Sequence, residues 1–146
     1  MISPREVREM LRNRPIYAIQ QEMQKNMGRW VSPVYPGHAI ELCEDKYTRL
    51  RPISETRNQI WDREDNNRYR NDGKNTWMDI SKGGDFTEND LIGFPDKDIS
   101  KKQNQQFTIN SDFVETYNGF LNCNGPNSKI TSSRNKKTKF IWQPIS

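Results

Sequence analysis

The sequence predicts an α+β fold with much irregular structure, in which short amphipathic helices and a few short strands precede an extended C-terminal segment. Two observations support this prediction. Only 32% of the 146 residues are hydrophobic and 29% are charged, so the chain is poorer in apolar residues than an average globular domain. Apolar residues at helical spacing occur near both ends of the chain, and long polar stretches separate them. The length allows one domain or two small ones, and no apolar run approaches the ~20 residues that a membrane span needs.

Residues 1–28 are predicted to form an N-terminal helical segment. Ser3 is a typical N-cap, Pro4 suits the first helical position, and Glu6 can reach back to the Ser3 amide. A second helix is predicted at 15–27, where apolar residues recur three or four positions apart: Ile16, Ile19, Met23 and Met27. Both apolar stripes are narrow, and we therefore expect these helices to dock on another surface.

Residues 29–121 are predicted to form a small, irregular α+β body. Two short strands are expected, at 38–43 and at 77–80, because apolar residues alternate there with polar ones. The stretches 62–75 and 96–106 are almost wholly polar. Such stretches do not hold themselves on a core, so they are predicted to be solvated loops, linkers or surfaces that a partner holds.

Three helical elements are predicted in the same body. Ser54 or Thr56 can cap a helix that begins near residue 57, and 87–94 is predicted to form a single helical turn. A longer helix is predicted at 112–121 after the cap residues Ser111 and Asp112, with an apolar face of Phe113, Tyr117, Phe120 and Leu121.

Residues 122–146 are predicted to be a basic C-terminal extension. Glu115 is the last acidic residue, so residues 1–115 carry 18 basic and 19 acidic groups, a net charge of −1. Five basic residues follow without an opposing acid: Lys129, Arg134, Lys136, Lys137 and Lys139. A segment of this kind can meet nucleic acid, an anionic lipid surface or an acidic protein surface.

The basic residues lead into the apolar segment Phe140–Ile141–Trp142. Because the aromatic residues are clustered and not interleaved with the lysines, the segment is predicted to be a hydrophobic plug, or a strand added to the sheet edge of a partner. Two alternatives remain. The lysines and aromatic rings could bind single-stranded nucleic acid, or the extension could be a solvated tail.

The four tryptophans are spread along the chain, each with few apolar neighbours in the sequence: Trp30, Trp61, Trp77 and Trp142. Tryptophan is enriched among the residues that dominate protein interfaces. Each is therefore predicted to anchor a separate stretch of the chain in a pocket on a neighbouring subunit. The alternative is one small core in which the tryptophans meet.

No catalytic, cofactor-binding or metal-binding residue is predicted. His38, Glu41 and Cys43 lie close in sequence but form no known catalytic arrangement. The run that begins at Asp96 resembles the start of a calcium loop, but Lys101 stands where the turn glycine is needed. Zinc-ligand spacings and phosphate-binding loops are absent from the sequence.

Cys43 and Cys123 are expected to be free thiols in a reducing compartment. The first residues lack the apolar stretch of a signal peptide, so the expected location is inside a cell or a virion. An internal repeat with a period of 20–50 residues is not detectable.

We therefore expect a non-enzymatic structural or accessory subunit that cements neighbouring subunits of a large assembly, with a minor capsid or connector protein of a virion as the preferred case. The alternatives are a protein inside a ciliary microtubule lattice, a nucleic-acid-binding protein that uses the basic extension, and a small enzyme. Other protein subunits are the expected partners. The residues predicted to bind them are Trp30, Trp61, Trp77, Lys136, Lys137, Lys139, Phe140, Ile141 and Trp142.

Overall fold

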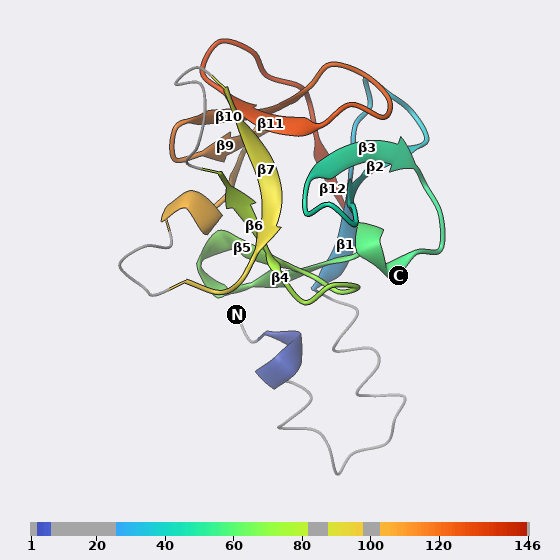
Figure 1. The fold of residues 1–146 in the computed structure, drawn as a ribbon, viewed down its shortest axis with the longest axis vertical. Coiled ribbons are helices and arrows are strands. Elements are labelled where there is room, and N and C mark those ends of the chain that lie inside the picture. Colours follow the sequence, from blue (N-terminus) through green and yellow to red (C-terminus); the bar gives the residue numbers. More distant parts are fainter. Residues whose placement is uncertain (1–2, 7–25, 82–87, 98–102, 146) are drawn as a thin grey trace.

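The computed structural model describes residues 3–6, 26–81, 88–97 and 103–145, and nearly all of its regular structure is antiparallel β-strand (Figure 1). The described residues also contain a helical turn at 4–6 and three 3-10 turns, at Arg57–Gln59, Asp65–Asn67 and 103–105. The strands are β1 (Met27–Val31), β2 (His38–Leu42), β3 (Thr48–Pro52), β4 (Trp61–Glu64), β5 (Arg68–Asn71), β6 (Trp77–Ile80), β7 (Glu88–Phe94), β8 (Thr108–Asn110), β9 (Phe113–Thr116), β10 (Gly119–Cys123), β11 (Ile130–Ser133) and β12 (Ile141–Pro144). Within these residues, no helix is long and apolar enough to cross a membrane.

The strands fall into three successive groups of four, and each group is paired in the same way. The first strand pairs with the second in β1–β2, β5–β6 and β9–β10. The second pairs with the third in β2–β3, β6–β7 and β10–β11. The first and fourth strands are also joined in each group. In the first group they form the ladder β1–β4. In the second and third groups a single main-chain hydrogen bond joins the residues at the starts of these strands, from Phe107 N–H to Asn67 O and from Phe140 N–H to Asp112 O. We call these groups the first, second and third repeats.

The first and fourth strands of the three repeats close into a barrel. The ladders β4–β5, β8–β9 and β12–β1 join one repeat to the next. The remaining hairpins meet in a cap, where β7 pairs with β11, Leu50 N–H donates to Ser128 O, and Gly93 N–H donates to Lys46 O. In Figure 1 the hairpins β2–β3 and β10–β11 lie in the upper half of the view, with β1, β4 and β5 below them.

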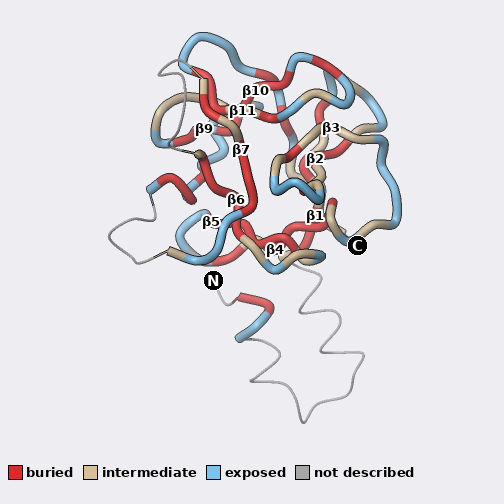
Figure 2. The backbone as a smooth tube through the Cα atoms, viewed as in Figure 1, coloured by how far each residue is buried: buried red, intermediate tan, exposed pale blue. Residues whose placement is uncertain are grey.

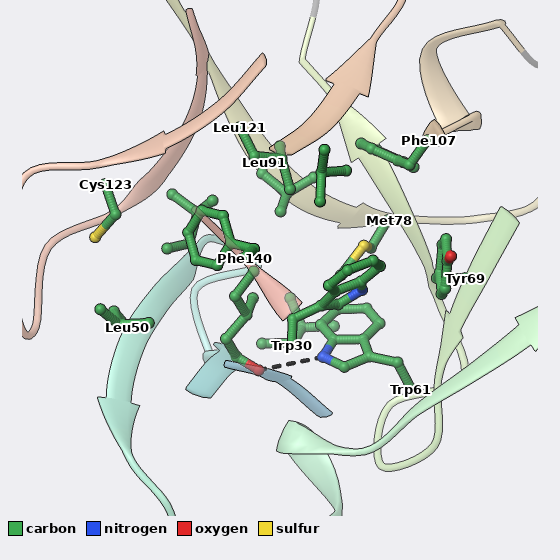
Figure 3. Packing of buried hydrophobic residues seen from close by; sticks show 14 of the residues in the cluster. Trp30, Leu50, Trp61, Tyr69, Met78, Leu91, Phe107, Leu121, Cys123 and Phe140 are labelled. Carbon is green, nitrogen blue, oxygen red and sulfur yellow. Dashed lines mark hydrogen bonds between the residues drawn. The ribbon is translucent and has the colours of Figure 1, made fainter. Parts of the chain in front are cut away.

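One core of fifteen side chains fills the interior, and each repeat supplies five of them (Figure 3). The first strand gives one, the second gives two separated by a single residue, the third gives one, and the start of the fourth gives an aromatic ring. In repeat order they are Trp30, Ile40, Leu42, Leu50 and Trp61; Tyr69, Met78, Ile80, Leu91 and Phe107; Val114, Leu121, Cys123, Ile130 and Phe140. Figure 2 shows this burial along the strands, with exposed residues in the connecting loops. Threefold repetition thus builds one core from a modest number of apolar residues.

The α+β prediction is therefore wrong, and the predicted helix at 112–121 illustrates the cause. This segment contains most of the hairpin β9–β10, and Thr116 pairs with Gly119 across a two-residue turn. Asn-Gly next to such a turn is a strong hairpin signal, and it outweighs a short helical spacing. Ser111, expected to be a cap, instead adopts a positive φ of 57° in the turn between β8 and β9.

The other predicted elements have mixed outcomes. The strands at 38–43 and 77–80 are confirmed as β2 and β6. The turn at 87–94 is wrong, since this segment contains β7, and the polar stretch 62–75 contains β4 and β5 instead of a solvated loop. Thr56 caps only a 3-10 turn, in which its Oγ1 accepts from Asn58 N–H at 3.3 Å.

At the N-terminus, the expected cap at Ser3 is confirmed, because its Oγ accepts from Glu6 N–H at 3.2 Å. A helix is also predicted at 15–27. Its last residue, Met27, belongs to β1 and not to a helix. Residues 15–25 of this prediction lie outside the described residues. At the other end of the chain, the expected extended segment contains β11 and β12. Since β12 pairs with β1, the two ends of the described body are held together.

The tryptophans lie mainly in one core. Trp30 and Trp61 are 0% exposed, and the Trp61 Nε1–H donates to Ile40 O at 3.1 Å. The rings of Trp30, Tyr69 and Trp142 form a triangle in which each pair of centroids is 5.1 Å apart. Trp77 is also buried, with the Arg68 guanidinium 3.9 Å from its ring centroid. These indoles therefore pack within the chain, and Trp30 and Trp61 present no surface to a partner.

We expect Tyr69 to make the fold sensitive to alkaline pH. Burial raises the pKa of its phenol above the ordinary value of 10.0, and the charge of Arg63 offsets part of the rise. The unfolded chain therefore loses this proton first, so the stabilisation is complete below about pH 10 and is lost as the pH rises through the folded-state pKa. Thermal melts between pH 8 and 11 should show a smaller alkaline fall in Tm for Tyr69→Phe than for the unchanged chain. Equal falls would contradict this account.

Candidate functional site

A polar side chain occupies the same place in the second strand of every repeat, between the two core residues of that strand. In each repeat it accepts a hydrogen bond from the residue that stands two positions before the core aromatic ring of the fourth strand. The pairs are Gln59 Nε2 to Glu41 Oε1 at 3.0 Å, Gln105 Nε2 to Asp79 Oδ2 at 2.8 Å, and Thr138 Oγ1 to Asn122 Oδ1 at 3.0 Å. Each repeat thereby fixes the loop before its fourth strand onto its second strand.

Two open pockets lie next to these contacts. The first-repeat pocket has a volume of about 390 Å³ and is lined by Glu41, Cys43, Glu44, Asp45, Arg49, Arg51 and Asn58. The third-repeat pocket has a volume of about 580 Å³ and is lined by Val34, Tyr35, Phe113, Asn122, Cys123, Asn124, Lys136, Lys137, Thr138 and Lys139. Each lining includes residues in or next to the second strand and residues of the loop before the fourth strand, so the two pockets share these positions of the repeat.

Two aromatic rings form a wall of the third-repeat pocket. Tyr35 follows β1 and packs against the core, and its hydroxyl donates to Cys123 O at 3.4 Å. Phe113 begins β9 and meets Phe120 edge to face, with the ring centroids 6.3 Å apart. Both Tyr35 and Phe113 are half-buried. Each ring is thus held by its neighbours while part of it remains accessible from the pocket.

The floor of this pocket is polar and well connected. Thr138 is central: its Oγ1 accepts from Cys123 N–H at 2.9 Å, and its own N–H donates to Leu121 O at 3.1 Å. Asn122 is 5% exposed, and its Nδ2 lies 3.4 Å from Asn124 Oδ1, while Asn124 itself is exposed. Burial raises the pKa of the Cys123 thiol, which disfavours the nucleophilic thiolate. The floor therefore offers amide groups for hydrogen bonding and no activated nucleophile.

Three lysines form the rim. Lys136, Lys137 and Lys139 are exposed, and the Lys137 ammonium lies 4.3 Å from the ring centroid of Phe113. The loop that carries them is fixed at its start, because Ser133 Oγ accepts from Lys136 N–H at 3.1 Å. None of the described lining residues is acidic. The rim is therefore positively charged, and cation–π contact holds one ammonium at the aromatic wall.

The first-repeat pocket has a different electrostatic character, because its charges are paired. Arg49 binds both carboxylate oxygens of Asp45, at 3.0 and 2.8 Å. The hydrogen bonds from Arg49 lower the pKa of Asp45 to about 2. Glu44 pairs with Lys74 at 2.8 Å. This pocket is consequently neutralised largely by its own side chains.

The structure places Glu41 and Cys43 at the first-repeat pocket but leaves His38 outside its lining. His38 and Cys43 stand at opposite ends of β2, roughly 17 Å apart along an extended chain. The His38 ring lies 3.0 Å from Pro36 O through its Nδ1 and is partly exposed. Across the described parts of the chain, no group of three or more histidine, cysteine or acidic residues is placed to hold a metal ion. Both cysteines are free.

Of the predicted partner-binding residues, Lys136, Lys137 and Lys139 gather at the third-repeat pocket. Phe140 is a core residue at 1% exposure, Ile141 is exposed, and Trp142 is partly buried against the core. The expected strand at this segment exists, and its partner is β1 of the same chain.

The sequence reasoning missed the other pocket residues, chiefly Tyr35, Phe113, Asn122 and Asn124. A usable signal was present in the recurrence of a polar residue two positions before an aromatic one, at Gln59-x-Trp61, Gln105-x-Phe107 and Thr138-x-Phe140. It marks the loops that line equivalent positions in the three repeats.

No protein-family model and no curated protein matches the sequence of this chain. Solved structures do share its fold. The β-trefoil lectin of the Vibrio vulnificus haemolysin/cytolysin, solved with N-acetyl-D-lactosamine bound, has a TM-score of 0.66 at 11% identity, over 83% of this chain and 96% of that one. The C-half of the earthworm R-type lectin, solved with GalNAc, has a TM-score of 0.62 at 10% identity, over 82% and 99% of the two chains.

A third similar structure is the Polyporus squamosus lectin bound to a human-type influenza-binding epitope. It has a TM-score of 0.63 at 16% identity over 83% of this chain, which spans about half of that lectin because only 49% of the lectin chain is covered. Identities this low show the fold and not the ligand. The threefold strand pattern and these superpositions together overturn the α+β prediction, and the chain has the β-trefoil fold.

Proposed function

We propose that this chain is a non-enzymatic saccharide-binding domain and that the third-repeat pocket is its binding site. The observation that carries the proposal is the combination of accessible aromatic rings and amide groups in one open pocket. Similar solved structures are named as lectins with sugars bound, which supports a non-enzymatic role in binding sugars.

The pocket suits the chemistry of a sugar ring. One face of a pyranose carries mainly C–H groups, and these pack on aromatic faces such as those of Tyr35 and Phe113. Hydroxyl groups at the ring edge both donate and accept, and the exposed amide of Asn124 can satisfy either role. A few fixed polar groups beside apolar surface are the usual composition of a small-ligand site.

We expect Phe113→Ala and Asn124→Ala each to weaken saccharide binding about tenfold or more. The first removes an aromatic surface, and the second removes a hydrogen-bonding group at the pocket floor. A printed array of neutral and acidic oligosaccharides identifies ligands, and titration calorimetry with the best of them gives the affinities. Tyr117→Ala is the matched control, since Tyr117 is 42% exposed on the adjoining hairpin turn and does not line the pocket.

Two outcomes would contradict the proposal. One is an array on which the folded chain binds no saccharide. The other is a bound saccharide whose affinity falls equally in the pocket variants and in Tyr117→Ala. Circular dichroism of each variant establishes that the loss does not come from unfolding.

The role as a cementing subunit, in a virion or a ciliary microtubule, is a second proposal. The observation that favours it is the exposure of aliphatic side chains near the pocket, with Val34 at 53% and Ile141 on β12 at 47%. The low apolar content of the chain does not support this role, because the described residues include a core of fifteen side chains. Binding to immobilised sugars in the absence of any other protein would favour the first proposal.

A further inference from the structure

We infer that the saccharide bound in the third-repeat pocket carries a negative charge, as a sulfate or a carboxylate. This inference rests on the proposed function, since it names the class of saccharide for the same pocket. Its basis is the balance of charge at the rim, where Lys136, Lys137 and Lys139 line the pocket and no described lining residue is acidic.

The three ammonium groups are weakly neutralised by the chain itself. Lys139 Nζ lies 4.0 Å from Asp112 Oδ2, and both side chains are at least 50% exposed. An exposed pair at this distance contributes little. From residue 116 onward the sequence contains no acidic residue at all, so the surrounding segment adds no compensating charge. An acidic ligand would supply the missing partner.

The position of Lys137 directs this charge to the place where a sugar ring would lie. Its ammonium is 4.3 Å from the centroid of Phe113 and 5.2 Å from that of Phe120. The aromatic faces attract the cation without supplying a hydrogen-bond acceptor equal to a carboxylate. An anionic substituent on a ring packed at this wall can therefore form a charge-assisted hydrogen bond.

The related pocket of the first repeat provides an internal comparison. At the equivalent positions it has Glu41, Cys43 and Asn58 where the third repeat has Asn122, Asn124 and Lys137. Its lining carries three acidic residues, Glu41, Glu44 and Asp45, against the two guanidinium groups of Arg49 and Arg51, so this pocket has no excess of positive charge. The first-repeat pocket is thus neutralised by residues of the chain itself, whereas the third-repeat pocket keeps a positive charge.

The test compares oligosaccharides printed in matched forms, each as the neutral sugar, its sulfated form and its sialylated form. We expect at least one acidic form to bind about tenfold or more tightly than its neutral counterpart in 0.15 M NaCl. This preference should shrink in 0.5 M NaCl, because the groups are exposed and salt screens them.

Paired variants assign the preference to residues. In the variant Lys136→Gln/Lys137→Gln the ratio of acidic to neutral affinity should approach one. The variant Lys46→Gln/Lys74→Gln also removes two positive charges, but at residues that do not line the third-repeat pocket. It should leave the ratio of acidic to neutral affinity unchanged. A single-stranded oligonucleotide serves as a competitor.

The outcomes separate the two proposals. Neutral and acidic forms bound equally well, or a ratio that changes alike in both double variants, would overturn the charge inference and leave saccharide binding intact. Failure to bind any saccharide overturns both proposals, and oligonucleotide binding in that case would support the nucleic-acid alternative.

Discussion

Replacing Trp61 by alanine is expected to lower the free energy of unfolding of the isolated chain by about 3–5 kcal/mol, the range for large aromatic residues in cores. The side chain is 0% exposed and belongs to the fifteen-residue core. Truncation leaves a cavity and removes the indole donor of Ile40 O, which is hydrogen-bonded at 3.1 Å. A loss of this size is comparable to the whole stability of many small domains.

Urea unfolding followed by far-ultraviolet circular dichroism measures this loss of stability. Two further variants serve as comparisons for its size. Trp61→Phe should cost less, because the equivalent positions of the other repeats are occupied by Phe107 and Phe140. Trp142→Ala should also cost less, since Trp142 is only partly buried at the margin of the core. If Trp61→Ala left the stability of the isolated chain unchanged, the indole would not have the internal role described here. The prediction that Trp61 anchors the chain to a partner would then apply again.

The composition misled the fold prediction because this chain buries many polar residues as well as apolar ones. The strands β4 and β5 have the sequences WDRE and RYRN, which contain two apolar residues in eight. Nevertheless Asp62, Glu64, Arg68 and Arg70 are all less than 9% exposed. Sequence hydropathy cannot identify such strands, because their charges are accommodated by pairs that exist only in the folded chain.

The repeat escaped detection because its loops differ in length. The spacing from the third-strand core residue to the aromatic residue at the fourth strand is 11, 16 and 10 residues, from Leu50 to Trp61, from Leu91 to Phe107 and from Ile130 to Phe140. A search at a fixed period cannot align these positions. The two apolar residues of the second strand keep the same spacing in all three repeats, so this pair is the constant element that a sequence can show.

The candidate site was predictable in part. The lysines were identified from charge alone, because a run of basic residues without acids is visible in the sequence. Tyr35 and Phe113 could not be joined to Lys137 in this way, since Tyr35 belongs to the first repeat and Phe113 stands 24 residues before Lys137 in the third. What the sequence indicated as a free basic extension is the rim of a pocket whose wall comes from distant strands.

Arg70→Met is expected to destabilise the isolated chain by about 3–5 kcal/mol, the range for breaking a buried ion pair by removing one partner. Arg70 and Asp62 face each other across β4 and β5, and Arg70 Nη2 lies 2.6 Å from Asp62 Oδ2. Their side chains are 7% and 0% exposed. The variant leaves the Asp62 carboxylate buried without this guanidinium, and methionine cannot donate a hydrogen bond to it.

The double variant Asp62→Leu/Arg70→Met separates the cost of removing Arg70 alone from the net contribution of the pair. Removing both charges replaces an expensive desolvated pair by apolar packing, so the double variant should recover most of the stability that Arg70→Met loses. Chemical denaturation of the three proteins under one buffer condition gives the coupling energy. Recovery would mean that side-chain packing and main-chain pairing hold the polar strands β4 and β5 in the fold. The ion pair would then serve only to compensate the two buried charges. A double variant as unstable as Arg70→Met would instead make this pair itself a net source of stability in a chain with few apolar residues.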